Sequence, residues 1–274
     1  MTDQGWGSKE VADAWKARAE ERRRSMAAVT ERMLDEAGVT AGMRVLDLGT
    51  GAAEVALFAA GRVGPGGAVV AVDSSKAMVE AARQAVKEAG AGNVTVLPPM
   101  DAARLDLEAA SFDAVVGRQV LMFVDVPKAL AEVRRVLRPG ARLGATVWGA
   151  LAANPYHRIV IEAVRGRGGW GEPVPDVVRA FAYDDESFWR RALVDAGFAD
   201  VGVQTMQVER AFASAEQALE AIRTSPIHGA PIARLPEGER GAAWQEIEAG
   251  CRAFGGVFPS QYRVLSGASG PGVG

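Results

Sequence analysis

The sequence predicts an α/β protein whose parallel sheet carries helices on both faces. Between residues 43 and 148, short apolar runs alternate with longer segments that carry apolar residues at helical spacing. A glycine turn follows the first run and opens a helix. An acid, Asp73, ends the next run, at the spacing from Gly49 at which nucleotide-binding βαβ units place the acid that holds a ribose.

Seven apolar runs are expected to form the sheet. Strands that are buried on both faces read as continuous apolar segments rather than as an alternating pattern. The regular alternation with helices lapses after residue 148 and resumes near residue 184. The expected strands lie at about residues 43–48, 68–73, 93–98, 112–117, 141–148, 199–209 and 257–265.

The first segment, residues 1–39, is expected to contain one helix that Ser8 caps and that runs to about Ala37. A charged run at residues 20–24 interrupts its apolar stripe, and a solvated face is the simplest interpretation. Trp6 and Trp15 are candidates for a flap over a bound ligand. The alternative is that they pack in the core or between two copies of the chain, which makes this helix a candidate contact in a homo-oligomer.

The segment 45–54 (VLDLGTGAAE) is interpreted as a buried strand, a glycine turn and the start of a helix. Gly49 and Gly51 let the backbone turn sharply and approach a ligand, and the N–H groups of the helix start face the same ligand. Glu54 stands where a dinucleotide-binding turn has its third glycine, and a carboxylate there would repel a pyrophosphate. S-adenosylmethionine has ribose hydroxyls but no phosphate, so it fits this turn better.

Five stretches resemble, in the same order, the landmarks of the class I S-adenosylmethionine-dependent methyltransferases, in the branch similar to the enzymes of ubiquinone and menaquinone biosynthesis. The resemblance departs from the family at Ala53, where a third glycine is common. It implies a Rossmann-like, doubly wound sheet of seven strands, mostly parallel with an antiparallel last strand. The stretches are VLDLGTGAAE at 45–54, VVAVDSSKAM at 69–78, LPPMDAARLD at 97–106, FDAVVGRQVLMFV at 112–124 and ALAEVRRVLRPGARL at 129–143.

The resemblance also implies a helical lid over the substrate, built from two inserts. Six consecutive segments are then expected along the chain. They are an N-terminal helical flap (1–39), a core that binds S-adenosylmethionine (40–148), a lid insert (149–183), a core helix and strand (184–212), a second lid insert (213–255), and a last core strand with a flexible tail (256–274).

The family pattern implies that Asp73 accepts both ribose hydroxyls and that Asp47 faces the ammonium end of the cofactor. A plain helix cap and a structural acid bonded to loop amides are the alternatives for these two carboxylates. Arg118 either meets the cofactor carboxylate or stays solvated.

Adenine is expected beside the third strand, where Asp101 would accept from its exocyclic amine and Met100 would pack on its face. Met78 either flanks the ring from the other side or lies in the core, and a surface loop is the alternative for Asp101. The full set of expected cofactor residues is Asp47, Gly49, Thr50, Gly51, Asp73, Ser74, Met78, Met100, Asp101, Ala102 and Arg118.

His157 and His228 are the only histidines in the sequence, one in each insert. His157 follows the fifth strand closely, and a histidine of ordinary pKa accepts protons at neutral pH, so His157 is the candidate catalytic base and His228 the second choice. A histidine on a helix surface is the alternative for His157. Two histidines and one cysteine make a zinc site improbable, and no metal is expected.

A formal net charge of −3 argues against nucleic acid or an anionic membrane as partner. A single cysteine and a polar start of the chain favour a cytoplasmic protein. We expect a methyltransferase that acts on a small, apolar or aromatic metabolite, with O-, C- and N-methylation all open. The alternatives are a protein of this fold that catalyses a cyclisation or only binds the cofactor, and a nicotinamide-dependent oxidoreductase.

Overall fold

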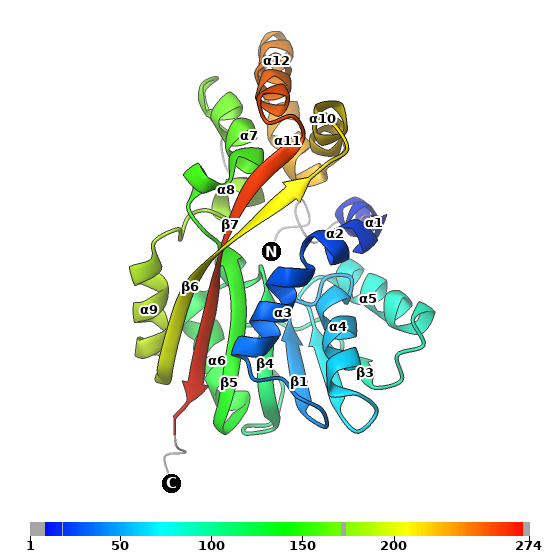
Figure 1. Cartoon of the computed structure of the whole chain (residues 1–274), viewed down its shortest axis with the longest axis vertical. Coiled ribbons are helices and arrows are strands. Elements are labelled where there is room, and N and C mark those ends of the chain that lie inside the picture. Colours follow the sequence, from blue (N-terminus) through cyan, green and yellow to red (C-terminus); the bar gives the residue numbers. More distant parts are fainter. Residues whose placement is uncertain (1–8, 18, 171–173, 271–274) are drawn as a thin grey trace. The chain divides into compact units, whose positions relative to one another are not determined.

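The computed structural model describes residues 9–17, 19–170 and 174–270. Seven strands form one sheet in the order β3-β2-β1-β4-β5-β7-β6, and β7 runs against its neighbours (Figure 1). The expected mixed seven-stranded sheet is therefore confirmed. The strands are β1 (Arg44–Leu48), β2 (Ala68–Val72), β3 (Val94–Val96), β4 (Phe112–Arg118), β5 (Leu137–Trp148), β6 (Phe198–Ala211) and β7 (Val257–Ser269).

The sheet reverses its order at β1, which has β2 on one side and β4 on the other. Both pairings are parallel, and Asp47 of β1 stands opposite Ala71 of β2 and Val116 of β4. The chain leaves the carboxyl ends of β1 and β4 in opposite directions across the sheet, which opens the crevice where doubly wound folds bind ligands. Asp47 and the glycine turn that follows β1 lie at this point.

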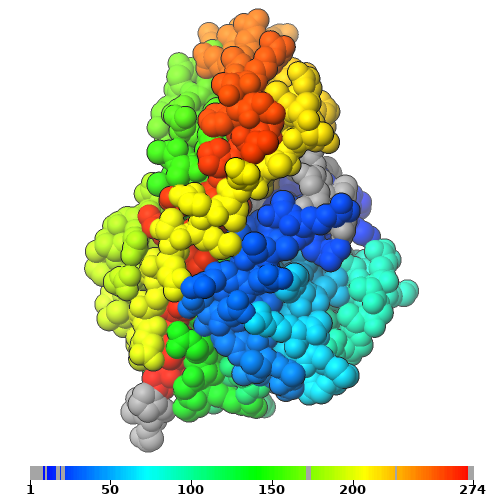
Figure 2. Space-filling model, viewed as in Figure 1, coloured from blue at the N-terminus to red at the C-terminus, as the bar shows by residue number. Residues whose placement is uncertain are grey.

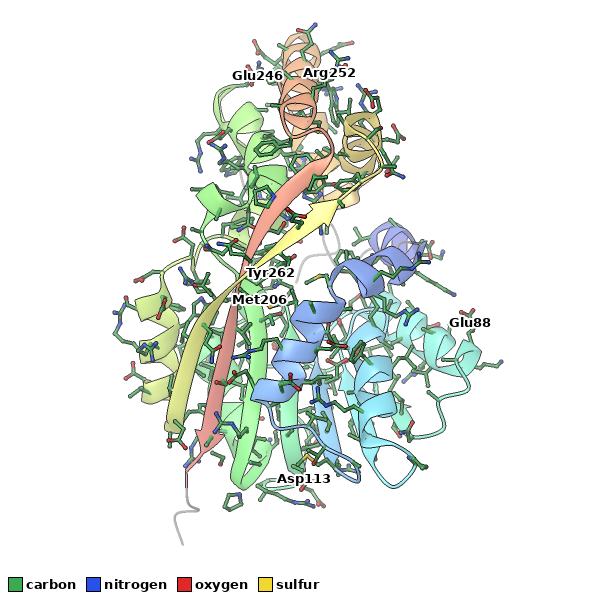
Figure 3. All side chains as sticks on the ribbon, in the orientation of Figure 1. Glu88, Asp113, Met206, Glu246, Arg252 and Tyr262 are labelled. Carbon is green, nitrogen blue, oxygen red and sulfur yellow. The ribbon has the colours of Figure 1, made fainter. Side chains whose placement is uncertain are left out.

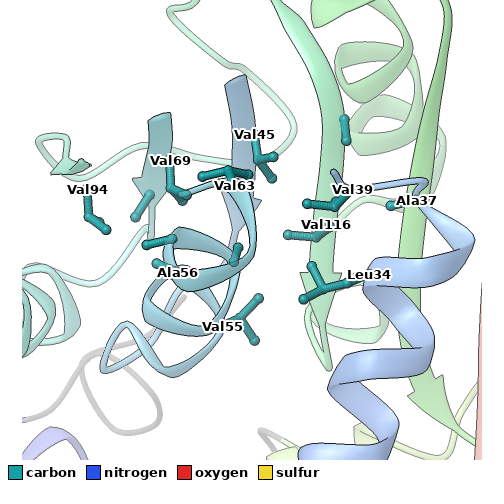
Figure 4. Packing of buried hydrophobic residues seen from close by; sticks show 14 of the residues in the cluster. Leu34, Ala37, Val39, Val45, Val55, Ala56, Val63, Val69, Val94 and Val116 are labelled. Carbon is teal, nitrogen blue, oxygen red and sulfur yellow. The ribbon is translucent and has the colours of Figure 1, made fainter. Parts of the chain in front are cut away.

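One apolar core joins the central strands to three helices: α3 (Ala27–Glu36), α4 (Glu54–Val63) and α5 (Lys76–Glu88). Small and β-branched residues dominate it, which lets the helices lie close against the strands. Helices α6 (Val126–Val136) and α9 (Glu186–Asp195) contact each other; in Figure 1 α6 lies behind the sheet and α9 at the left, beside β6. Figure 4 shows part of this core, with Leu34, Val45, Val55, Val69 and Val116 among the labelled residues.

The expected single N-terminal helix is wrong, because the structure has three short helices there. They are α1 (Lys9–Ala17), α2 (Ala19–Ser25) and α3. Met26 separates α2 from α3, and Arg22 of α2 turns its side chain back to donate to the carbonyl of Trp15 in α1. Trp6 and the expected cap Ser8 lie outside the described residues.

The contacts divide the chain into two compact units. The second unit comprises residues 148–184 and 206–262, and both expected inserts fall within it. Its core packs Tyr156, Val160, Ile222, Ile247 and Phe258 together. The regular alternation of strands and helices lapses after residue 148, and the stretch that follows contains an amphipathic helix, α7. The helices of this unit are α7 (Pro155–Arg165), α8 (Asp176–Arg179), α10 (Ala215–Arg223), α11 (Pro226–Ala233) and α12 (Glu237–Ala253).

Helix α3 packs on the sheet through Gly144 of β5. A Cβ at this position would lie 2.3 Å from the carbonyl oxygen of Met33 and 2.8 Å from the Cβ of Ala37. We therefore expect Gly144→Ala to lower the free energy of unfolding by about 1–3 kcal/mol, since the clash is with backbone. Gly66→Ala is the control, because a Cβ there meets no atom within 4 Å. Chemical denaturation measures both, and equal stability of the two variants would contradict this packing.

Candidate functional site

Asp73 fixes the glycine turn by accepting two backbone hydrogen bonds. Its Oδ2 accepts from the amide of Gly51 at 3.0 Å, and its Oδ1 accepts from the amide of Ser75 at 2.9 Å. Burial raises the pKa of this carboxyl, and the backbone amides oppose the shift. Each carboxylate oxygen has a further lone pair. Asp73 can therefore hold the turn and still accept from a ligand hydroxyl.

Three residues of the turn have positive φ angles: 68° at Gly49, 55° at Gly51 and 64° at Ala53. A Cβ at Gly49 would lie 2.5 Å from the Cγ2 atom of Val120, so only glycine fits there. Ala53 carries its Cβ in the left-handed region, which costs roughly 1–2 kcal/mol. This explains why a glycine is common at this position in similar sequences, and the structure shows that the turn forms with alanine.

Asp47 is the most deeply buried acid at the turn, with 1% of its surface exposed. Its Oδ2 accepts from the Thr50 hydroxyl at 2.6 Å, whereas its Oδ1 is buried without a hydrogen-bond partner at normal distance among the described residues. Burial raises the pKa of Asp47 to about 7, although the Thr50 hydroxyl and the charge of Arg118 act against this. A bound cation would satisfy Oδ1 and lower the pKa.

Glu54, the first residue of α4, lies buried between two arginines. Arg118 donates to its Oε2 at 2.5 Å and to the Thr30 hydroxyl at 3.0 Å. Arg22 donates to Oε1 through Nε at 2.9 Å and also through Nη2. The side chain of Arg118 is thus buried, so the solvated alternative is wrong, and its contact with a cofactor carboxylate stays a prediction.

The same ion pairs change two other interpretations of the sequence. Arg22 was assigned to a solvated charged run, but it is buried. The sequence contains a sign of this burial, because Arg22 stands in helical register with the apolar residues Trp15, Met26 and Met33. The charge of Glu54 is neutralised, so its repulsion of a pyrophosphate is a weaker argument than expected. Glu54 still fills the space that a third glycine leaves open.

Helix α1 covers the glycine turn. The guanidinium of Arg22 lies 3.8 Å from the centre of the Trp15 ring, and Trp15 Nε1 lies 3.3 Å from a Cβ placed on Gly51. Farther along α1, Lys16 pairs at 3.3 Å with Glu88, which Figure 3 labels at the end of α5. Figure 2 shows these blue helices resting on the cyan residues of α4 and α5. A ligand at the turn would lie beneath α1.

The adenine-side residues divide into buried and exposed ones. Met78 is buried against Val11 of α1, so a ligand reaches it only if α1 moves. The amide of Met100 donates to the carbonyl of Asp73 at 2.9 Å, which brings these two expected residues together. Asp101 lies in an exposed turn where its Oδ1 accepts from the amide of Ala103, so the surface-loop alternative describes its present position. Ala102 is buried and Ser74 is exposed.

The two histidines lie together inside the second unit. His157 Nδ1 is 2.9 Å from His228 Nε2, and His228 Nδ1 is 2.8 Å from the Ser225 hydroxyl. His157 is 6% exposed, so it is not a surface histidine. Burial lowers the pKa of His157 well below its usual value, and the charges of His228 and Arg210 lower it further. The expectation of an ordinary pKa is therefore wrong, and His157 is neutral at pH 7.

Within the described ranges, no group of three or more His, Cys, Asp and Glu side chains is arranged to hold a metal ion. None of the described helices combines the length and the apolar character that a membrane crossing requires.

Comparisons with known proteins agree with this geometry. Residues 45–140 match a family described as a methyltransferase domain. Nocamycin O-methyltransferase from Saccharothrix syringae is 40% identical over 119 residues, 43% of this chain and 42% of that enzyme, so the chain covers about two-fifths of its length. A ubiquinone/menaquinone biosynthesis C-methyltransferase from Geobacter sulfurreducens is 30% identical over 172 residues, 58% of this chain and 66% of that enzyme.

A solved S-adenosylmethionine-dependent methyltransferase from Aquifex aeolicus has a TM-score of 0.50 and 27% identity, covering 65% of this chain and 83% of its own. The fold, the turn and these similarities define the class of the matched region: residues 45–140 are a methyltransferase domain, and the chain is similar to the S-adenosylmethionine-dependent methyltransferases. Within this class it is similar to the ubiquinone/menaquinone branch, as its sequence indicated. The cofactor of the class is S-adenosylmethionine.

Asp47 should make the free protein less stable as the pH rises. Its folded-state pKa of about 7 exceeds the ordinary 3.8, so the folded state binds more protons between these values and stability falls across that window. Three pKa units correspond to roughly 4 kcal/mol as an upper bound. We expect Asp47→Asn to remove most of this loss in denaturation curves between about pH 4 and pH 8. The exposed Asp106→Asn is the control, and an unchanged slope in Asp47→Asn would contradict the assignment.

Arg22 should hold α1 and α2 over the turn. In Arg22→Met, Glu54 keeps Arg118 as partner, so the sheet stays folded while the N-terminal helices lose their buried anchor. Hydrogen exchange of α1 amides should quicken by about tenfold or more, since local opening becomes easier by at least 1.4 kcal/mol. Arg23→Met, at the exposed neighbouring position, is the matched control. Equal exchange in both variants would show that Arg22 does not hold these helices.

Proposed function

We propose that this protein transfers the methyl group of S-adenosylmethionine to a small, apolar or aromatic metabolite. The observation that carries the proposal is the glycine turn, where Asp73 is bonded to Gly51 and the buried Asp47 has an oxygen without a partner at normal distance among the described residues. A neutral sugar edge and a cationic amine are the ligand groups that suit these two carboxylates. S-adenosylmethionine carries both.

The residues of the first unit would bind the cofactor in the following way. Asp73 accepts from the ribose hydroxyls, and Asp47 accepts from the ammonium group through Oδ1. Glu54 with its two arginines leaves one net positive charge near the helix start, which suits the cofactor carboxylate without a direct contact. Met100 lies beside the adenine, and Asp101 accepts from its amine after a small movement of its exposed turn. Thr50, Ser74 and Ala102 shape the backbone around these groups.

Positioning is the main contribution that the chain has to make. When bound, S-adenosylmethionine supplies an electrophilic methyl group on a sulfonium that leaves as a neutral thioether. Fixing two reactants in line is worth roughly 7–11 kcal/mol, whereas a general base contributes about 10²–10⁴-fold, or 3–5 kcal/mol. His157 is the proposed proton acceptor for an acceptor hydroxyl. Its lowered pKa keeps the imidazole neutral and ready to accept, but makes it a weak base on its own.

The proposal extends to partners and location. A net charge of −3 disfavours binding to nucleic acid or to an anionic membrane surface, and we infer a cytoplasmic protein that works on a soluble metabolite. Any homo-oligomer through the N-terminal helices would have to use faces other than that of Trp15, which packs against Arg22 of its own chain.

Titration calorimetry with S-adenosylmethionine and with NADH tests the proposal. We expect S-adenosylmethionine to bind and NADH not to bind. Asp73→Ala should weaken this binding by roughly 2–4 kcal/mol, because the ribose hydroxyls lose a charged acceptor. The exposed Asp106→Ala should leave it unchanged, and a thermal melt checks that both variants are folded. Binding of NADH instead, or unchanged affinity in folded Asp73→Ala, would overturn the proposed function.

Gly51→Val provides an independent variant, since Asp73→Ala also removes two backbone hydrogen bonds. Valine at a φ of 55° is strained, and its Cβ would meet Trp15 at 3.3 Å. Cofactor binding should be lost. If the wild-type protein binds the cofactor but turns over no methyl acceptor, it binds the cofactor for another purpose, such as a cyclisation.

A further inference from the structure

Three side chains of the second unit form an unbroken hydrogen-bonded chain. The Ser225 hydroxyl lies 2.8 Å from His228 Nδ1, and His228 Nε2 lies 2.9 Å from His157 Nδ1. The Ser225 hydroxyl also caps α11 by accepting from the amide of His228. Buried imidazoles in direct contact are costly unless each ring nitrogen has a partner. Three of the four ring nitrogens have such a partner in the chain.

The fourth nitrogen, Nε2 of His157, is the open end of the chain. It is buried and has no hydrogen-bond partner among the described residues. Aromatic rings surround the imidazole: its centre lies 4.4 Å from that of Trp148 and 5.4 Å from that of Phe181. Trp148 in turn stacks on Tyr262 at 4.5 Å and 28°, and Figure 3 labels Tyr262 in this part of the structure. One polar atom thus stands in an apolar, aromatic setting.

The hydrogen bonds of this three-residue chain can run in either of two directions. If His228 donates to His157, Nε2 of His157 carries a proton and is a donor. If His157 donates to His228, then His228 donates to the Ser225 oxygen, and Nε2 of His157 presents a lone pair. Neutral histidines satisfy both arrangements, which differ in the ring nitrogen that carries the proton in each imidazole.

A neutral hydroxyl is the ligand group that suits both directions, because it donates and accepts. An ammonium only donates, and it would add positive charge to a site already under the influence of Arg210, whose guanidinium lies 4.7 Å from the centre of the Tyr156 ring. A carboxylate only accepts, so it suits one direction. Flat aromatic walls favour a planar molecule. Phenols and enols combine these properties.

We propose that Ser225, His228 and His157 form a proton relay whose open end, Nε2 of His157, takes the hydroxyl proton of a planar phenolic or enolic acceptor. The inference rests on the proposed function and deepens it by naming the acceptor class. The acceptor O–H bond breaks as an N–H bond forms at Nε2. The proton on Nδ1 then passes to Nε2 of His228, and the acceptor oxygen keeps the electron pair of the broken bond as an oxyanion, the nucleophile that methyl transfer needs.

The relay compensates for the weak basicity of His157, because the proton does not have to stay on it. The titratable and charged groups that act on this imidazole are His228 on α11 and Arg210 on β6, and both disfavour a proton on it. Passing the proton on leaves His157 neutral and puts the charge on His228, whose Nδ1–H then donates to the Ser225 oxygen. His228 and Ser225 are positioning residues here, since His157 alone meets the acceptor.

The test uses 4-nitrophenol as probe, because it is planar and phenolic and its anion absorbs visible light. With ¹⁵N-labelled histidine, the NMR spectrum of the tag-free protein contains only two sets of imidazole signals, since the chain has two histidines. We expect 4-nitrophenol to shift His157 Nε2 most. We also expect the bound phenol to ionise about half a pH unit or more below the free phenol. No change at His157 Nε2 would overturn the proposal.

Variants separate a relay from a merely structural pair. His228→Gln should abolish the ionisation shift of bound 4-nitrophenol while its affinity changes by less than about threefold. Ser225→Thr keeps the hydroxyl and the cap, so it should retain the shift. An unchanged shift in His228→Gln would show that His157 works without a relay and overturn the inference. Failure here with intact S-adenosylmethionine binding leaves the proposed function standing, whereas loss of cofactor binding in the wild-type protein would count against the function itself.

Discussion

The buried carboxylate of Glu54 links the parts of the first unit that make a cofactor site. Arg22 reaches it from the N-terminal helices and Arg118 from the end of β4, while Glu54 itself begins the helix that follows the glycine turn. A buried charge must be paired, because leaving it alone costs several kcal/mol. Pairing therefore fixes where α2 lies, and α2 in turn sets Trp15 of α1 over Gly51.

Two of the buried polar atoms that lack a hydrogen-bond partner within the described ranges belong to residues of the proposed function. Oδ1 of Asp47 in the first unit and Nε2 of His157 in the second lack hydrogen-bond partners among the described residues. A buried, unsatisfied group costs about 1–3 kcal/mol. Folded proteins keep such groups where binding or chemistry uses them. In the proposed function, the first accepts from a cationic group and the second meets a hydroxyl.

Local patterns predicted the fold well and the buried charges poorly. The order of strands and the turn at Gly49 follow from short apolar runs and glycines, which act over a few residues. The partners of Glu54 stand 32 positions earlier and 64 positions later in the chain. Only folding brings such groups together. The sequence therefore placed Arg22 in a solvated charged run, and it left Arg118 either solvated or in contact with the cofactor.

The histidine pair shows the same limit, because His157 and His228 lie 71 positions apart.

Mass spectrometry of small molecules released from the purified, denatured protein tests the central claim most directly. The account predicts S-adenosylmethionine or its demethylated product, in an amount that Gly51→Val lowers. A nicotinamide dinucleotide released in its place would contradict it.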